Sequence, residues 1–399
     1  MDRTIVEQVG VLMRGTTYGD PGLGEAMRVE LGQRLEAASR EGRPLRVYCG
    51  FDPRTSDLHL GHTVPLAKLR QFQELGHEVT VVVGTFTSLV GDPSDKREGR
   101  RLMRREEVRA NGRTYAEQAF RILDPARTRV AFNDEWLSRI GLEEFADLAS
   151  RFTVQQLVGR DNFKLRWERG ERIQLQETFY PILQARDACE LRADVQVGGS
   201  DQLFNIVTAS RRLMEASGLL PNVAVIVALL PGTDGTTKMS KSLGNHIPLR
   251  APPSDMFGKL MSIPDEAMRT YLELLTALPA RDVDALLAGH PRAAKVRLAR
   301  EVTARFHTIE AAEAAARDFE RVFSRREVPE HLPAHRALPG ETVATALVRI
   351  GAAGSASEAR RLVAGGGVRL DGERLDDPLA PLRSGTLRVG PRRFYRIES

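Results

Sequence analysis

The chain of 399 residues has few of the features that mark secreted or membrane proteins. Its two cysteines, Cys49 and Cys189, are too few for a disulfide framework and fit a reducing compartment. No apolar run approaches the roughly 20 residues that a membrane-spanning helix needs, and no apolar signal segment follows Met1. These absences predict a cytoplasmic protein with no membrane partner.

The composition is otherwise that of a folded protein with several domains. Hydrophobic residues make up 42% and charged residues 28% of the chain, which is typical of soluble globular proteins. The length is too great for one ordinary core and predicts two or three domains. A formal net charge of +5 permits an acidic partner such as RNA but does not require one.

The first half of the chain has the pattern of a parallel sheet. Residues 46–51 are predicted to form a buried strand, 60–75 a helix and 78–84 a valine-rich strand, which together make a βαβ unit. Residues 101–192 look mostly helical, as an insertion between the two halves of the sheet. Ligands of such sheets bind at the carboxyl ends of the strands.

The sheet is predicted to resume after this insertion. Residues 194–197 and 223–229 look like further strands, joined by a helix over 201–216. The sequence therefore predicts one nucleotide-binding domain over residues 1–247, with an α/β fold and a helical insertion at about 101–192.

The remainder divides into three parts. Residues 248–327 have helical spacing throughout and predict an all-helical domain, and the proline-containing segment 328–339 is predicted to be a linker. Residues 340–399 form a small α+β unit, in which residues 355–358 match a capping box at a helix start. This unit has ten arginines against seven acidic residues, which fits either an RNA-binding surface or an ordinary solvent-exposed helix.

Two short segments are suited to bind a polyphosphate. His59-Leu60-Gly61-His62 opens a predicted helix, whose N-terminus attracts anions, and Lys238-Met239-Ser240-Lys241-Ser242 offers two ammonium groups on a loop flanked by Gly and Thr. The histidines could also be core or surface residues, or metal ligands, although no third ligand lies at a suitable spacing. The lysines could belong to a solvated loop. The preceding residues 48–53 favour a nucleotide site.

A polar stripe follows one helix face. Tyr180, Gln184 and Asp187 lie at positions i, i+4 and i+7, and Pro181 suits the first turn of that helix. Such a stripe is more often a solvent face. Because apolar residues bracket it here, part of the stripe is expected to point into a cleft.

The two phosphate-binding segments resemble those of the class I aminoacyl-tRNA synthetases. Residues 48–53, 180–187 and 198–202 narrow the resemblance to the tyrosyl-tRNA synthetases, and residues 347–372 resemble an S4 RNA-binding domain. The resemblance implies a Rossmann-like class I nucleotide-binding sheet, followed by a helical domain and a small α+β S4 domain.

The resemblance also implies an activity. Enzymes of this family activate L-tyrosine with ATP and Mg²⁺ to tyrosyl-adenylate and pyrophosphate, then transfer tyrosine to the 3′ end of tRNA(Tyr). They work as homodimers. No protein-bound metal is predicted.

Site residues carry over from the family position by position. The implied catalytic residues are His59, His62, Lys238, Lys241, Lys96 and Arg100. The implied tyrosine-binding residues are Tyr48, Asp92, Tyr180, Gln184, Asp187 and Gln202. The implied ATP-binding residues are Cys49, Gly50, Asp52, His59, His62, Gly199, Asp201, Lys238 and Lys241.

Three positions depart from the family pattern. Arg54 stands where threonine is usual, Asp95 where glycine is usual, and Arg186 where tyrosine is usual. Arg186 would either lower the pKa of the neighbouring Asp187 or compete with substrate for its carboxylate. The rival interpretations are a tryptophanyl-tRNA synthetase, an inactive RNA-binding relative and another nucleotidyltransferase. Asp187, Tyr48, the intact lysine segment and the S4-like tail speak against them.

Overall fold

The computed structural model describes residues 4–53, 57–93, 103–159, 161–323, 332–390 and 393–398. These form two compact units, the first comprising Met1–Pro252 and Lys259–Val302, the second Pro253–Gly258 and Thr303–Ser399. Within the described residues, no helix is both long enough and apolar enough to cross a membrane.

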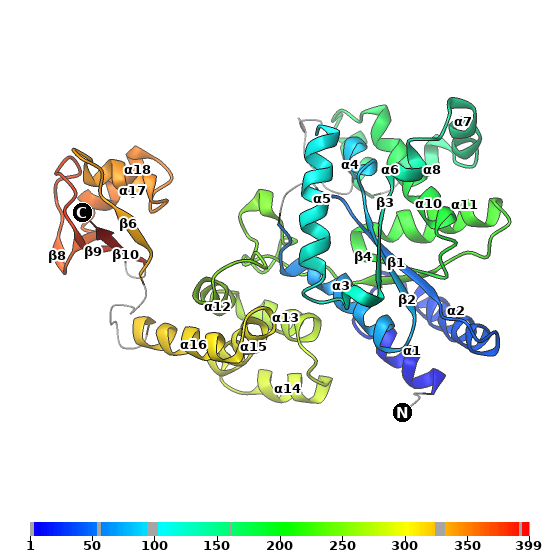
Figure 1. Ribbon diagram of the computed structural model, residues 1–399, viewed down its shortest axis with the longest axis horizontal. Helices are drawn as coiled ribbons and strands as arrows, with labels where there is room; N and C mark the ends of the chain where they lie inside the picture. The colour runs from blue at the N-terminus through cyan, green and yellow to red at the C-terminus, as the bar shows by residue number, and fades with distance from the viewer. Residues whose placement is uncertain are drawn as a thin grey trace. The chain divides into compact units, whose positions relative to one another are not determined.

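The first unit is built on a parallel sheet of five strands. The order is β3-β2-β1-β4-β5, and every pairing is parallel. Figure 1 shows β1 to β4 side by side. The strands are β1 (Arg46–Phe51), β2 (Glu78–Val83), β3 (Thr128–Phe132), β4 (Val195–Gly199) and β5 (Val223–Val227). The strand order reverses at β1, which places a ligand crevice at the carboxyl ends of β1 and β4.

Strand β3 lies within residues 101–192, the insertion that is predicted to be mostly helical, and this strand was not identified from the sequence. Its five residues pair with β2 at the edge of the sheet. The buried amide of Gln73 holds the start of this strand by donating to the Arg127 carbonyl and the Thr128 hydroxyl. A short strand without a continuous apolar run gives little periodic signal, so tertiary contacts decide it.

Helices surround this sheet. The helix expected over 60–75 is α3 (Leu60–Glu74), which packs on β1, β2 and β4. The polar stripe lies on α10 (Tyr180–Glu190), which has a proline in its first turn and packs against α11 (Arg211–Ala216). The other α-helices before β5 are α1 (Ile5–Met13), α2 (Pro21–Arg40), α4 (Thr87–Val90), α5 (Arg105–Ala119), α6 (Asp134–Leu137), α7 (Leu142–Ser150), α8 (Val154–Val158) and α9 (Asp161–Glu168).

The helix expected over 201–216 is not a single α-helix. It begins with a 3₁₀ turn, η3 (Ser200–Gln202), continues as a π-helix, η4 (Phe204–Ser210), and becomes α-helical only at α11. The Ser210 hydroxyl donates to the Asn205 carbonyl five residues earlier. Residue propensities do not predict such a wide turn, which is rare and short in proteins.

The segment from 253 to 323 is helical, as expected. Its α-helices are α12 (Pro253–Met261), α13 (Met268–Leu275), α14 (Ala280–Ala288), α15 (Pro291–Phe306) and α16 (Ile309–Phe323). The two compact units divide this segment between them, so the unit boundaries differ from the sequence boundaries at 247 and 340.

The second unit contains a small sheet in the order β6-β10-β9-β7-β8, with helices α17 and α18 side by side (Figure 1). Its elements are β6 (Ala334–Arg336), α17 (Val343–Arg349), α18 (Ala356–Ala364), β7 (Val368–Leu370), β8 (Glu373–Arg374), β9 (Gly385–Val389) and β10 (Arg393–Glu398). Aliphatic side chains of both helices and of β7, β9 and β10 form its core.

Two details of this unit differ from expectation. Residues 334–336, expected in a linker, form β6 and pair in parallel with β10 at the chain's end. The Ser355 hydroxyl caps α18 by accepting from the Glu358 N–H, but the Glu358 carboxylate accepts from the Gly354 N–H. The capping box is therefore shifted by one residue on its acidic side.

A buried carboxylate joins the amino ends of β1 and β4 and supplies a test of the fold. Asp194 accepts hydrogen bonds from the Arg46 backbone and guanidinium and from Arg43, and the largely buried Arg34 lies 3.8 Å away. Burial by itself raises the pKa of Asp194, but hydrogen bonds from Arg46 and Arg43 hold this pKa below its usual value.

Asp194→Ala should lower the free energy of unfolding by about 3–5 kcal/mol, because it leaves Arg34 buried without its carboxylate. Urea denaturation followed by circular dichroism measures the loss. Asp147→Ala, which removes an exposed ion pair with Arg151, is the control and should cost about 0.5 kcal/mol or less. Equal stability of the two variants would contradict the assignment.

Candidate active site

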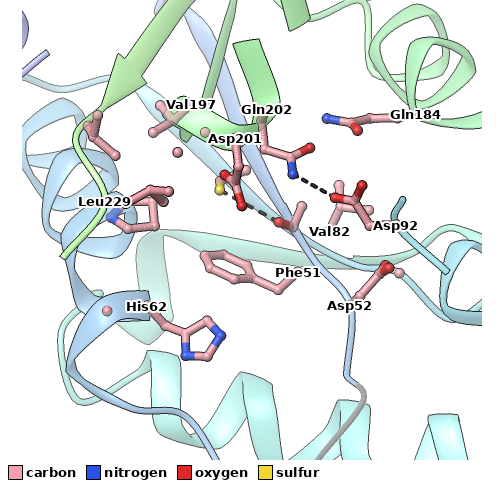
Figure 2. A pocket seen from close by; sticks show the side chains of 18 of the residues that line it. Phe51, Asp52, His62, Val82, Asp92, Gln184, Val197, Asp201, Gln202 and Leu229 are labelled. Atoms are coloured by element: carbon pink, nitrogen blue, oxygen red, sulfur yellow. Dashed lines mark hydrogen bonds between the residues drawn. The ribbon is translucent and has the colours of Figure 1, made fainter. Parts of the chain in front are cut away.

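A cavity of about 460 Å³ opens at the carboxyl edge of the five-stranded sheet, where the strand order reverses. Figure 2 shows His62 of α3 on one side of it, with Asp201 and Gln202 of η3 and the nearby Gln184 and Asp92 on the other. The predicted site residues that line this cavity are Tyr48, Cys49, Gly50, Asp52, His59, His62, Asp92, Tyr180, Gln184, Asp187, Gly199, Asp201, Gln202, Lys238 and Lys241.

The remaining predicted residues, Lys96 and Arg100, lie outside the described residues, as do Arg54 and Asp95. Among the described residues there is no group of three or more His, Cys, Asp or Glu side chains placed to hold a metal ion.

The two histidines begin α3 and are bonded to its first turn. The His59 Nδ1 accepts from the Gly61 N–H at 3.2 Å, and the His62 Nδ1 accepts from the His59 N–H at 3.2 Å. Glycine favours this close approach, since a Cβ at position 61 would lie 3.0 Å from the His59 ring and the ring would have to shift. Burial first, and then the neighbouring His62, hold the pKa of His59 well below its usual value. His59 is therefore neutral, and its proton is on Nε2.

Side-chain hydrogen bonds hold the loop that carries Lys238 and Lys241. The Asn245 Nδ2 donates to the Asp234 carboxylate at 2.6 Å, and the Asn245 Oδ1 accepts from the Ser240 N–H at 2.8 Å. Asp234 in turn accepts from the N–H groups of Thr236 and Thr237. These contacts fix the loop backbone on both sides of Lys238. The roles of Asp234 and Asn245 were not predicted from the sequence.

Both lysines of the loop lie near carboxylates. The Lys238 Nζ is 3.2 Å from Asp201, and the Lys241 Nζ is 3.8 Å from Asp57. Since all four side chains are partly exposed, these ion pairs contribute little stability. An entering polyanion can therefore take the lysines from their carboxylates at small cost.

The closed end of the cavity holds a buried carboxylate. The Asp187 side chain accepts from the Trp136 Nε1 at 2.7 Å and from the Asn133 Nδ2 at 3.2 Å. Burial raises the pKa of Asp187 to about 7, although these two hydrogen bonds favour the charged form. Sequence reasoning missed both donors, because they lie at and after the end of β3, the strand that it also missed.

Tyr48 of β1 lies at the same end. Its hydroxyl is buried and makes no hydrogen bond of good geometry with the described residues, although the Ser210 hydroxyl lies near enough to interact weakly with it. Burial and the neighbouring Asp187 raise the pKa of Tyr48 well above its usual value. A buried hydroxyl that is so weakly hydrogen-bonded is costly, so Tyr48 and Asp187 together suit a ligand that brings a hydroxyl of its own.

Arg186 does not compete for this carboxylate. Its guanidinium lies 2.9 Å from Glu190 and 3.7 Å from Glu144, and it does not line the cavity. Arg186 lowers the pKa of Asp187 less than the hydrogen bonds from Trp136 and Asn133 do. The departure from the family pattern at this position therefore acts on the outer face of α10.

The wall between the two ends of the cavity is acidic and rich in amides. The Gln202 Nε2 donates to Asp92 at 2.6 Å, as the dashed line in Figure 2 marks. Tyr180 is buried beside them, and burial, followed by Asp52 and Asp92, raises its pKa well above the usual value. Carboxylates gathered around a small cavity favour a cationic group.

Two glycines and a thiol also line the cavity. A Cβ at Gly199 would lie 2.7 Å from the side chains of Asp201 and Leu229, so a larger residue there would force these two side chains to move. At Gly50, by contrast, a Cβ would meet no atom within 4 Å, so steric contact does not explain why glycine is found at this position. Burial raises the pKa of the Cys49 thiol, which keeps it neutral.

Comparisons with known families agree with this geometry. The family model described as tRNA synthetases class I (W and Y) matches residues 40–324, and the S4 domain model matches residues 343–387. The tyrosine–tRNA ligase of Moorella thermoacetica is 43% identical over 409 residues, covering 100% of this chain and 97% of the relative. That of Thermotoga maritima is 44% identical over 372 residues, covering 91% and 92%.

Solved structures show the same fold at lower sequence identity. The tyrosyl-tRNA synthetase of Archaeoglobus fulgidus, complexed with L-tyrosine, has a TM-score of 0.61 at 21% identity, covering 78% of this chain and 100% of that one. The tryptophanyl-tRNA synthetase of Giardia lamblia has a TM-score of 0.55 at 17% identity, covering 71% and 82%.

The hydrogen bond between Trp136 and Asp187 makes a spectroscopic prediction. The chain has only two tryptophans, and the other, Trp167, is 68% exposed. In Trp167→Phe protein, the fluorescence of Trp136 should change with a midpoint near pH 7, as protonation of Asp187 weakens the bond. Adding Asp187→Asn should abolish the transition. A transition that persists in the double variant would mean that another group titrates beside Trp136.

Proposed function

The chain belongs to the class I tRNA synthetases and, within them, to the tyrosine–tRNA ligases, and we propose how the residues of its cavity carry out the reaction. The enzyme activates L-tyrosine with ATP to tyrosyl-adenylate and pyrophosphate, then transfers tyrosine to the 3′ end of tRNA(Tyr). The observation that carries the residue assignment is the position of the buried Asp187 carboxylate beside the buried, weakly hydrogen-bonded hydroxyl of Tyr48 at one end of the cavity.

The phenol of tyrosine is proposed to bind at this closed end. Its hydroxyl donates to the Asp187 carboxylate and accepts from the Tyr48 hydroxyl, so that all three polar groups are satisfied. Phenylalanine would leave both protein groups buried without this partner, and it is rejected for that reason. Trp136 and Asn133 hold the carboxylate in place through the hydrogen bonds described above.

The ammonium and carboxylate of the substrate are proposed to bind along the middle of the cavity. Asp92, Gln184 and Tyr180 take the ammonium, because they offer one carboxylate and two neutral oxygens in an acidic wall. Gln202 lies beside Asp92 and is proposed to bind the substrate near its carboxylate. This arrangement directs that carboxylate toward the nucleotide end.

ATP is proposed to bind between the start of α3 and the lysine loop. Cys49, Gly50, Gly199 and Asp201 surround the ribose and the α-phosphate together with the Asp52 backbone. Because the Nδ1 of His59 is already an acceptor, its Nε2–H donates to the phosphates without adding a charge. His62 faces the ribose.

The chemistry requires positioning and charge stabilisation. The tyrosine carboxylate attacks the α-phosphorus, and the bond to pyrophosphate breaks. Lys238 and Lys241 are proposed to neutralise the charge that grows on pyrophosphate, joined by Lys96 and Arg100 from outside the described residues. ATP is proposed to enter with Mg²⁺ held mainly by its phosphates, as is common for this ion.

The remaining proposals concern partners. The unit that matches the S4 domain is proposed to bind tRNA(Tyr) through its arginines.

A homodimer is proposed through the segment from 142 to 175, where large apolar side chains are exposed, namely Leu142, Val154, Leu165, Trp167 and Leu175. Sedimentation equilibrium of the full chain tests the dimer. We propose that the enzyme works in the cytoplasm.

The assignment of the phenol end is tested by ATP–pyrophosphate exchange. We expect exchange with tyrosine and little with phenylalanine or tryptophan. Asp187→Asn should lower kcat/KM for tyrosine by about a hundredfold or more, since its amide cannot accept from both donors and the phenol.

In the unsubstituted enzyme, KM for tyrosine should rise as the pH falls below about 7, where Asp187 becomes protonated.

Arg186→Leu is the control for this test, because its guanidinium faces Glu144 and Glu190. It should leave the preference for tyrosine unchanged. Better exchange with tryptophan than with tyrosine, or full tyrosine activity in Asp187→Asn, would contradict the assignment.

The RNA-binding proposal is tested by ending the chain at Glu327. Tyrosine–pyrophosphate exchange should remain, because every cavity residue precedes this point, while aminoacylation of tRNA(Tyr) should fall. In the full chain, the paired substitution of Arg360 and Arg361 by alanine should weaken tRNA binding, with the largest effect at low salt. A truncated enzyme that charges tRNA at the full rate would contradict the role of this unit.

A further inference from the structure

Asn205 lies behind the wall of the cavity. It is fully buried in the π-helix η4, and it is not among the residues that line the cavity. Its carbonyl accepts from the Ser210 hydroxyl at 3.0 Å. The side-chain amide of Asn205 lies on the other side of the cavity wall, where it contacts residues of α10 and η3.

One nitrogen of Asn205 binds two cavity glutamines. Its Nδ2 lies 3.0 Å from the Gln184 Oε1 and 3.0 Å from the Gln202 Oε1. Because an amide nitrogen has two hydrogens, Asn205 can donate one to each oxygen. Gln184 comes from α10 and Gln202 from η3, so this single amide fixes two side chains from separate elements.

The two bonds also decide which way each glutamine amide points. If Gln202 were turned over, its NH₂ group would face the NH₂ group of Asn205, and its oxygen would face the Asp92 carboxylate. Both contacts would be repulsive. In the observed orientation the Gln202 Nε2 donates to the Asp92 Oδ2 at 2.6 Å, so a continuous path of hydrogen bonds runs from Asn205 to Asp92.

We propose that Asn205 is a positioning residue for the ammonium group of the substrate. It keeps the Gln184 oxygen at the ammonium site and, through Gln202, orients the Asp92 carboxylate. This inference rests on the proposed function, in which Asp92 and Gln184 take the ammonium. Asn205 itself does not touch the substrate.

The proposal separates ligands by their charged groups. Tyramine has the phenol and the ammonium of tyrosine but no carboxylate, whereas 3-(4-hydroxyphenyl)propionate has the phenol and carboxylate but no ammonium. A misplaced ammonium site weakens tyrosine and tyramine more than the propionate, which loses only part of its contact with Gln202 near the carboxylate. A general loss of structure weakens all three, so the ratio of affinities reports positioning alone.

The test is calorimetric titration of the full-length enzyme with these three ligands. In Asn205→Leu, of similar size but without donors, Kd for tyrosine and tyramine should rise by about tenfold to a hundredfold. Kd for the propionate should rise by a clearly smaller factor, because only its contact with Gln202 is disturbed. Asn205→Ser, a smaller change, should shift the same ratio in the same direction if the leucine variant does not fold.

The chain offers a matched control in Asn222, another fully buried asparagine that donates to a glutamine oxygen, that of Gln196, at 2.7 Å. It does not line the cavity. Asn222→Leu should destabilise the fold in a similar way and leave the tyramine-to-propionate ratio unchanged.

The outcomes are distinct. Equal weakening of tyramine and the propionate in folded Asn205 variants would overturn the inference and leave the proposed function standing. If Asp92→Asn and Gln184→Ala did not weaken tyramine relative to the propionate, the proposed ammonium site would be wrong, and this inference with it.

Discussion

The burial of a carboxylate at the closed end of the cavity is the constraint on which the rest of the site depends. Asp187 accepts hydrogen bonds from Asn133 and Trp136 because the residues that follow β3 pack against α10. Removed from water, the carboxylate is costly to ionise, and burial raises its pKa to about 7. Two fixed donors lower that cost but do not remove it. In the proposed complex the substrate phenol adds a further hydrogen bond, which favours the charged form of this carboxylate.

The same requirement for partners extends along the whole cavity. Asn133 also donates to Thr87, and Thr87 donates to Asp52 at the nucleotide end. Asn205 connects Gln184 with Gln202, and Gln202 with Asp92. Side chains that would otherwise adopt several rotamers are thereby held in one. Because these side chains are already ordered, less of the free energy of substrate binding is lost in ordering the site.

The nucleotide end follows a different principle. Lys238 and Lys241 are paired with carboxylates in partly exposed positions, where ion pairs are weak. The backbone beneath them is held by Asp234 and Asn245. A fixed loop with easily released cations suits a reaction in which negative charge develops on a departing group, because the lysines can change partner without moving the chain.

The sequence by itself determined the strongly periodic elements and the predicted site residues that line the cavity. Strand β1 and helix α3 lie where their apolar patterns predicted, and every described residue of the predicted site lines one cavity. Only the tertiary structure decided strand β3, the π-helix and strand β6, since each is short and is in contact with distant parts of the chain. It also decided the supporting residues Asn133, Trp136, Asn205 and Asn245. A residue that faces a ligand belongs to a local motif, whereas a residue that supports it is chosen by whichever distant polar group needs a partner, and no spacing along the chain records that need.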